Sequence, residues 1–179
     1  ILEKHIDYVI VSGYVAILHG RSRASEDVDL LIPEMEFSKF KDLFEDLDKN
    51  GFECANTSNP REAYDMLDSY AIRFFKEGLP IPNMEFKKIT DRIHKEAFDN
   101  RLRVILGEEI LYISPLELQI AYKLTLIAPG EPEELHSDKD FDDAKHIFET
   151  FKNKLNMEKI IYFVDLFKVR KMWEFFKDE

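Results

Sequence analysis

The stretch VSGYVAILHGRSRASEDVDLLI, residues 11–32, decides the fold that we predict for this chain. A short β-branched run ends just before Ser12, and Ser12 and Gly13 have the character of a turn. The apolar residues that follow are typical of one or two helical turns closed by Gly20. The pattern therefore predicts a strand, a glycine turn and a short helix, followed by a second strand.

Two aspartates stand inside that second strand, residues 27–32. Asp27 and Asp29 share one face because side chains alternate along a strand. Two ionised carboxylates so close together cost electrostatic energy unless a positive charge lies between them, and magnesium is usually held by one or two carboxylates with water and phosphate oxygens. The pair thus predicts a magnesium site next to a nucleotide, with Ser12 and Gly13 at a helix N-terminus as phosphate donors.

Residues 8–32 resemble the signature of the polymerase-beta-like nucleotidyltransferase superfamily, which has a glycine and serine turn, a helix, and two acids that flank one apolar residue. The resemblance implies transfer of a nucleoside monophosphate from a nucleoside triphosphate to a hydroxyl. It places Ser12 and Gly13 on the phosphates. It places Asp27 and Asp29 on magnesium, in a scheme where two ions clamp the attacking and leaving oxygens. The intervening residues are similar to a minimal bacterial and archaeal branch that includes AbiEii-type toxins; they are Tyr14, Ala16, His19, Gly20, Arg23 and Ser25.

The family normally has a third carboxylate on a later strand, which binds the second ion and activates the acceptor hydroxyl. Glu85, in the stretch NMEFKKI, is the candidate, because it alternates out of phase with Met84 and Phe86. Its longer side chain departs from the aspartate usual at this place. Asp68 and Glu109 therefore stay open as alternatives.

A further resemblance lies in the second half of the chain, where such toxins carry a lysine in a KL helix and an acidic KD helix start. Here the two elements are YKLTLI and SDKDFDDAKHIF. Lys123 falls on an apolar helical stripe, and an inward lysine needs an anion. Asp140 is expected to pair with Lys123 or to orient it towards a triphosphate, and Arg23 is expected to contact phosphate. The alternatives are helix capping for Asp140, snorkelling to water for Lys123 and a solvated loop position for Arg23.

Strand patterns continue up to residue 114, and helical patterns follow. Two hairpins are predicted, one joining YAIRFF to NMEFKKI and one centred on Gly107. Helices are expected at about 34–49, 60–67, 115–128, 138–153, 157–167 and 169–177, with the longest loop at 128–134. We therefore expect an α+β fold, a mixed sheet with flanking helices. A nucleotidyltransferase core would span residues 1–114, and a C-terminal helical region, 115–179, would complete the nucleotide cleft.

The composition limits the partners of the chain. With a net charge of -11, its surface should repel polyanions, so a nucleic-acid partner would need a local basic patch. The single cysteine, Cys54, excludes an internal disulfide and suits a reducing compartment, so we expect a cytoplasmic protein. Neither a long apolar run nor a signal-peptide pattern is present, so no membrane partner is expected. The only basic concentration consists of Lys87, Lys88, Arg92, Lys95, Arg101 and Arg103.

Together these patterns predict a magnesium-dependent nucleotidyltransferase with a nucleoside triphosphate as substrate. Its hydroxyl acceptor is open between a tRNA end, a protein and a small molecule, and the acidic surface argues mildly against RNA. The alternative is a non-catalytic nucleotide- or partner-binding module of the same fold, such as a toxin–antitoxin subunit. The protein partners to consider are a second copy of the chain, which would make a homodimer, and an antitoxin.

Overall fold

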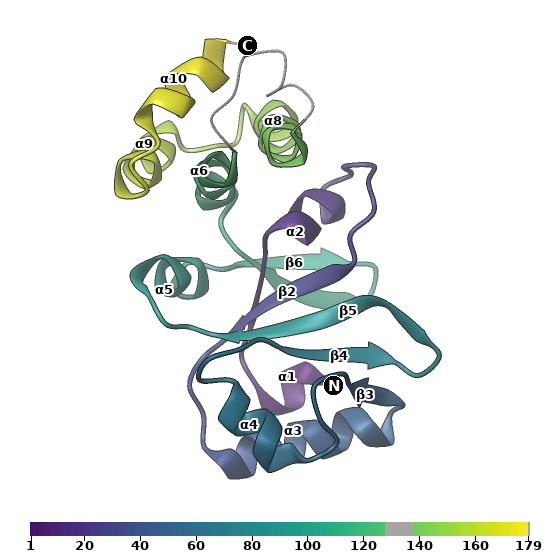
Figure 1. Ribbon diagram of the computed structural model, residues 1–179. Helices are drawn as coiled ribbons and strands as arrows, with labels where there is room; N and C mark the ends of the chain where they lie inside the picture. The colour runs from purple at the N-terminus through teal and green to yellow at the C-terminus, as the bar shows by residue number, and fades with distance from the viewer. Residues whose placement is uncertain (128–137, 179) are drawn as a thin grey trace. The chain divides into compact units, whose positions relative to one another are not determined.

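A computed structural model describes residues 1–127 and 138–178 of the chain (Figure 1). Two compact units form: the first comprises Ile1–Tyr14 and Ala24–Ile113, and the second comprises Val15–Arg23 and Ser114–Glu179. The loop expected at 128–134 lies outside the described residues. Within the described part of the chain, every helix is too short or too polar to cross a bilayer.

The first unit is built on a seven-stranded mixed sheet. Its strands are β1 Val9–Val11, β2 Asp27–Ile32, β3 Phe52–Cys54, β4 Ile72–Lys76, β5 Leu79–Lys88, β6 Leu102–Leu106 and β7 Glu109–Ile113. Their order is β3-β4-β5-β2-β1-β7-β6, so β2 lies in the middle of the sheet. It runs antiparallel to β1 and parallel to β5. Both predicted hairpins, β4–β5 and β6–β7, are confirmed.

One face of this sheet carries buried apolar side chains, among them Leu30, Phe74 and Phe86. Helices cover this face (Figure 1). Phe44 contacts Phe74 of β4, which contacts Phe86 of β5, with ring centroids 5.2 and 5.5 Å apart. Burial of this face fixes the register of the strands, because a one-residue slip would turn each side chain to the opposite side. The helices of the unit are α1 Leu2–His5, α3 Phe37–Lys49, which carries Phe44, α4 Pro60–Met66 and α5 Arg92–Asp99.

The second unit consists of helices and of residues 15–23. Its long helices are α6 Leu116–Leu126, α8 Lys139–Phe151, α9 Met157–Leu166 and α10 Arg170–Asp178, all four close to their predicted bounds. The short helix α2, Gly13–Leu18, begins in the first unit and continues into the second. The core of the second unit is apolar: the ring of Phe148 packs edge-on against Trp173 and Phe176 at 5.8 and 5.7 Å.

Candidate functional site

Asp27, Asp29 and Glu85, the three predicted acids, lie on one face of the sheet. It is the face opposite to the one that carries Phe74 and Phe86. In the parallel pairing of β2 and β5, Asp27 lies opposite Asn83 and Asp29 lies opposite Glu85. Residues in register on paired strands project to the same side, so the three carboxylates share one face. The fold therefore brings Glu85 next to Asp29, although the two are far apart in the sequence.

The two aspartates of β2 each use one oxygen in a contact with β5. Asn83 Nδ2 donates a hydrogen bond of 2.7 Å to Asp27 Oδ1. Lys87 Nζ donates one of 3.0 Å to Asp29 Oδ1. Because Asp27 Oδ2 and Asp29 Oδ2 take no part in these bonds, each carboxylate keeps a lone-pair donor for a further ligand.

Glu85 is the most enclosed of the three acids and has two cations beside it. Lys87 Nζ lies 3.1 Å and Arg73 Nη2 lies 3.2 Å from Glu85 Oε1, while the Glu85 side chain is only 8% exposed. Burial by itself lowers the pKa of Lys87, but the hydrogen bonds and charges of Asp29 and Glu85 outweigh it and raise the pKa above 10.5. Lys87 is therefore a cation at neutral pH.

A single magnesium ion fits Asp27 and Asp29. They supply hard oxygen donors on one face of a strand, and magnesium commonly takes one or two carboxylates and fills its remaining positions with water and substrate phosphates. A site in which protein side chains supply most of the metal ligands would need a larger group of ligating residues. Over residues 1–127 and 138–178, no group of three His, Cys, Asp or Glu side chains is placed to hold a metal ion. The face that carries Asp27, Asp29 and Glu85 could therefore supply two carboxylate ligands to one ion, whose other positions would be filled from outside the protein.

The two alternatives for the third carboxylate lie at other places. Asp68 forms an ion pair with Lys88, whose side chain leaves β5 on the face opposite to that of Glu85. Glu109 is exposed at the first position of β7 and lies opposite Leu106. Neither carboxylate belongs to the face that carries Asp27 and Asp29.

The turn at Ser12 and Gly13 begins next to Asp29. Val11, the last residue of β1, pairs with Asp29 across the sheet, and α2 starts at Gly13. Between them Ser12 adopts a φ of 63°, in the left-handed region, which costs a non-glycine residue roughly 1–2 kcal/mol. Strained backbone of this kind is found preferentially at ligand sites.

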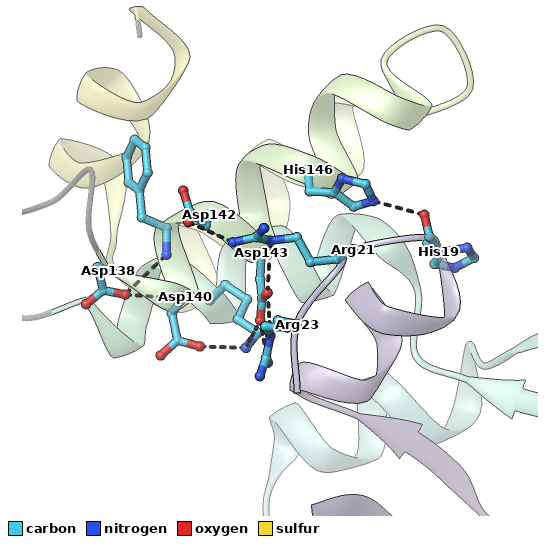
Figure 2. Close-up of polar contacts among 10 residues, drawn as sticks. His19, Arg21, Arg23, Asp138, Asp140, Asp142, Asp143 and His146 are labelled. Atoms are coloured by element: carbon cyan, nitrogen blue, oxygen red, sulfur yellow. Dashed lines mark hydrogen bonds and ion pairs between the residues drawn. The ribbon is translucent and has the colours of Figure 1, made fainter. Parts of the chain in front are cut away.

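The remaining predicted site residues form a buried ion-pair network in the second unit (Figure 2). Lys123 Nζ lies 2.5 Å from Asp140 Oδ1 and 2.8 Å from Asp143 Oδ2. Arg23 donates to both oxygens of Asp143, from Nε at 2.9 Å and from Nη2 at 2.8 Å. Lys123 is 1% exposed and Asp143 is fully buried. Lys123 therefore does not snorkel to water, and Arg23 is not a freely solvated loop residue.

Asp143, which pairs with both Lys123 and Arg23, is a central residue of this network that the sequence did not lead us to expect. It follows Asp140 by three positions on α8, a spacing that puts both on neighbouring parts of the helix surface, and this is the signal that could have found it. Arg21 adds a hydrogen bond of 2.7 Å to Asp142, so the network contains three cations and three carboxylates. The residue that caps α8 is Asp138 and not Asp140, because the side chain of Asp138 accepts hydrogen bonds from backbone N–H groups of the first turn.

The basic stretch over residues 87–103 is largely neutralised. Five of its six cations form ion pairs with carboxylates. Binding of a nucleic-acid backbone needs several cations free to release the counterions of phosphates. The stretch therefore does not provide a strong polyanion surface; its pairs are Lys87 with Asp29, Lys88 with Asp68, Arg92 with Glu96, Lys95 with Asp99 and Arg101 with Asp7.

Comparisons with known proteins show the fold. No protein-family model and no curated protein matches the chain. The solution structure of the antibiotic-resistance factor ANT(2'')-Ia matches 94% of this chain and 85% of its own, with 12% identity and a TM-score of 0.56. An antigenic nucleotidyltransferase-like protein from Paracoccidioides brasiliensis matches 97% of this chain and 85% of its own, with 16% identity and a TM-score of 0.53. The predicted α+β fold of nucleotidyltransferases is confirmed.

Proposed function

We propose that this chain transfers a nucleoside monophosphate from a nucleoside triphosphate to a hydroxyl acceptor, with magnesium bound by Asp27 and Asp29. The acceptor oxygen bonds to the α-phosphorus and loses its proton, while the bond to the β-phosphate breaks and pyrophosphate leaves. The observation that supports the proposal most strongly is the placement of these two carboxylates. They lie on one face of a central strand, next to the strained turn at Ser12, in the fold of nucleotidyltransferases. Each of the two carboxylates has one oxygen that takes no part in the hydrogen bonds from Asn83 and Lys87.

The chemistry asked of the protein is mainly positioning, as is general for phosphoryl transfer. Magnesium, when bound, would neutralise the charge that develops on the transferred phosphoryl group. Asn83 holds the carboxylate of Asp27, and Lys87 holds that of Asp29. The Ser12 hydroxyl and the backbone N–H of Gly13 are proposed as donors to the phosphates. Glu85 completes the acidic set.

The nucleotide-binding role predicted for Arg23, Lys123 and Asp140 is a separate part of the proposal. It is supported by the sequence pattern and by the presence of a fully enclosed lysine in the second unit. The substitution Arg23→Lys tests it, because lysine keeps the charge and loses the paired donors of the guanidinium. We expect weaker binding of the triphosphate, and unchanged affinity would remove Arg23 from the nucleotide contacts.

Transfer of a label tests the main proposal. The protein is incubated with each α-labelled nucleoside triphosphate, magnesium, and total RNA, total protein or a set of small molecules with free hydroxyls. Asp29→Asn should reduce transfer by about 100-fold or more, a typical loss for an electrostatic contributor. Asp65→Asn makes the same carboxylate-to-amide change at an exposed position of α4 and should leave transfer unchanged. Equal labelling by wild type and Asp29→Asn would overturn the proposal.

A second candidate is a nucleotide-binding module without turnover. The observation that favours it is the placement of Glu85, whose Oε1 atom already forms ion pairs with Arg73 and Lys87 and is therefore not free to contact an acceptor hydroxyl. Binding of a triphosphate without transfer to any acceptor would support this candidate. The narrower assignment to an AbiEii-type toxin rests on the resemblance of residues 8–32. A second small chain that co-purifies with the protein would support a toxin–antitoxin pair.

A further inference from the structure

Lys87 connects β2, which carries Asp27 and Asp29, to β5, which carries Glu85. It follows Glu85 by two residues on β5, so both side chains project from the same face of the sheet. Its ammonium nitrogen lies 3.0 Å from Asp29 Oδ1 and 3.1 Å from Glu85 Oε1. One positive charge thus joins a carboxylate of β2 to a carboxylate of β5.

A point between two carboxylates is also the place where a second divalent ion would bind. In sites with two ions, the ions lie about 3.5–4 Å apart and clamp the attacking and leaving oxygens. An ion on Asp29 and Glu85 would compete with the ammonium of Lys87 for the same two oxygens. It would also stand within a few ångströms of a like charge, which is unfavourable in a partly buried site.

Glu85 is less available to a metal than Asp27 and Asp29 for two further reasons. Its side chain is 8% exposed, whereas that of Asp29 is 19% exposed. Its Oε1 atom also has the guanidinium of Arg73 at 3.2 Å, so two cations already balance its single negative charge. The negative charge that a second ion would balance is therefore already balanced by Lys87 and Arg73.

We propose that Lys87 takes the place of the second divalent ion, so that the site binds one divalent ion, on Asp27 and Asp29, instead of two. The inference rests on the proposed function, since it requires a metal site at these two aspartates. It assigns Lys87 the role of a positioning residue that holds Asp29 and Glu85 together. The number of ions that the protein binds is its direct consequence.

Binding of Mn²⁺ alone, followed by calorimetry and by electron paramagnetic resonance, counts the ions. The wild type should bind one Mn²⁺ per chain. Lys87→Met keeps most of the side-chain stem and removes the charge, so it should bind two, with spectra broadened by spin coupling between neighbouring ions. Lys88→Met, at the next position and on the opposite face of β5, should still bind one.

The outcomes separate the inference from the function on which it rests. Two coupled ions in the wild type, or a single ion in folded Lys87→Met, would overturn the inference and leave the proposed metal site in place. No binding by the wild type, with Mn²⁺ alone or with a non-hydrolysable triphosphate analogue added, would overturn both. The count in the wild type decides the question even where Lys87→Met does not fold, and circular dichroism reports which case applies. A purely structural Lys87 would change the thermal stability without adding an ion.

Discussion

At Ser12, the backbone conformation and the hydroxyl make separable contributions. Ser12→Gly should stabilise the protein by about 1 kcal/mol, because glycine adopts a φ of 63° without the steric cost that serine bears there. The same substitution should weaken triphosphate binding as much as Ser12→Ala does, because both remove the hydroxyl. Thermal unfolding and calorimetric titration of a triphosphate analogue measure the two effects.

Lys168 provides a matched control for Ser12, because it has a φ of 59° in the second unit. Lys168→Gly should give a similar gain in stability and leave triphosphate binding unchanged. If Ser12→Gly bound the triphosphate as tightly as the wild type does, the Ser12 hydroxyl would not contribute to triphosphate binding.

At Lys123, a buried cation balances two buried carboxylates. Lys123→Met preserves the packing of the stem but leaves Asp140 and Asp143 without their ammonium partner, and breaking a buried pair in this way costs about 3–5 kcal/mol. We expect a loss of that size in the free energy of unfolding measured with urea. Lys139→Met, at an exposed position of α8, should change it by less than about 0.5 kcal/mol. Similar stabilities of the two variants would contradict a structural role for the network.

At the scale of elements, the segment after α2 is tied to α8 by two histidines. The ring N–H of His146 donates to the His19 carbonyl oxygen at 2.9 Å, and the His19 ring packs edge-on against Phe151 at 4.8 Å. Burial, and secondarily the charge of His146, lower the pKa of His19 below 6.5. The unfolded chain therefore binds more protons than the native chain as pH falls below about 6.5, and stability is lost in that range.

His19→Gln removes this proton linkage while retaining a polar side chain of similar reach. We expect its melting temperature to fall less than that of the wild type between pH 7 and pH 5. Thermal unfolding followed by circular dichroism across this range provides the comparison. Parallel curves for the two proteins would show that His19 contributes nothing to the acid sensitivity.

Elements with strong periodicity could be predicted from the sequence, and short ones could not. The strand Asp27–Ile32 has the bounds that its alternation predicts, because a strand with one acidic and one apolar face has a single stable register. Two elements were missed, α1 with four residues and α5 with eight, since neither is long enough to show a clear apolar repeat. The Asp91 side chain, which accepts from His94 N–H, was a usable capping signal for α5.

Partners across the fold are the part of the site that local patterns could not reveal. Lys87 and Asp29 are 58 residues apart, and Arg23 and Asp143 are 120 apart. The first contact depends on the parallel pairing of β2 with β5, which follows from the order of the strands in the sheet. The acids could be proposed from the sequence because the patterns that single them out lie within a few neighbouring residues.

At the scale of the whole molecule, the negative net charge opposes the binding of phosphate. Any affinity for a phosphate group must therefore come from one local site. The net charge is -11, and most cations of the one basic stretch are paired with carboxylates, so the overall field opposes the approach of a polyanion. Two of the negative charges lie at the proposed site itself, on Asp27 and Asp29. A triphosphate should therefore bind well only when a divalent ion accompanies it.

Calorimetric titration of a non-hydrolysable triphosphate analogue, with and without magnesium, tests this central claim most directly. The wild type and the control Asp65→Asn should bind the analogue at least about tenfold more tightly with magnesium, which corresponds to roughly 1.4 kcal/mol. Asp29→Asn should show no such gain. Equal affinities of the wild type with and without magnesium, or an undiminished gain in Asp29→Asn, would contradict the account.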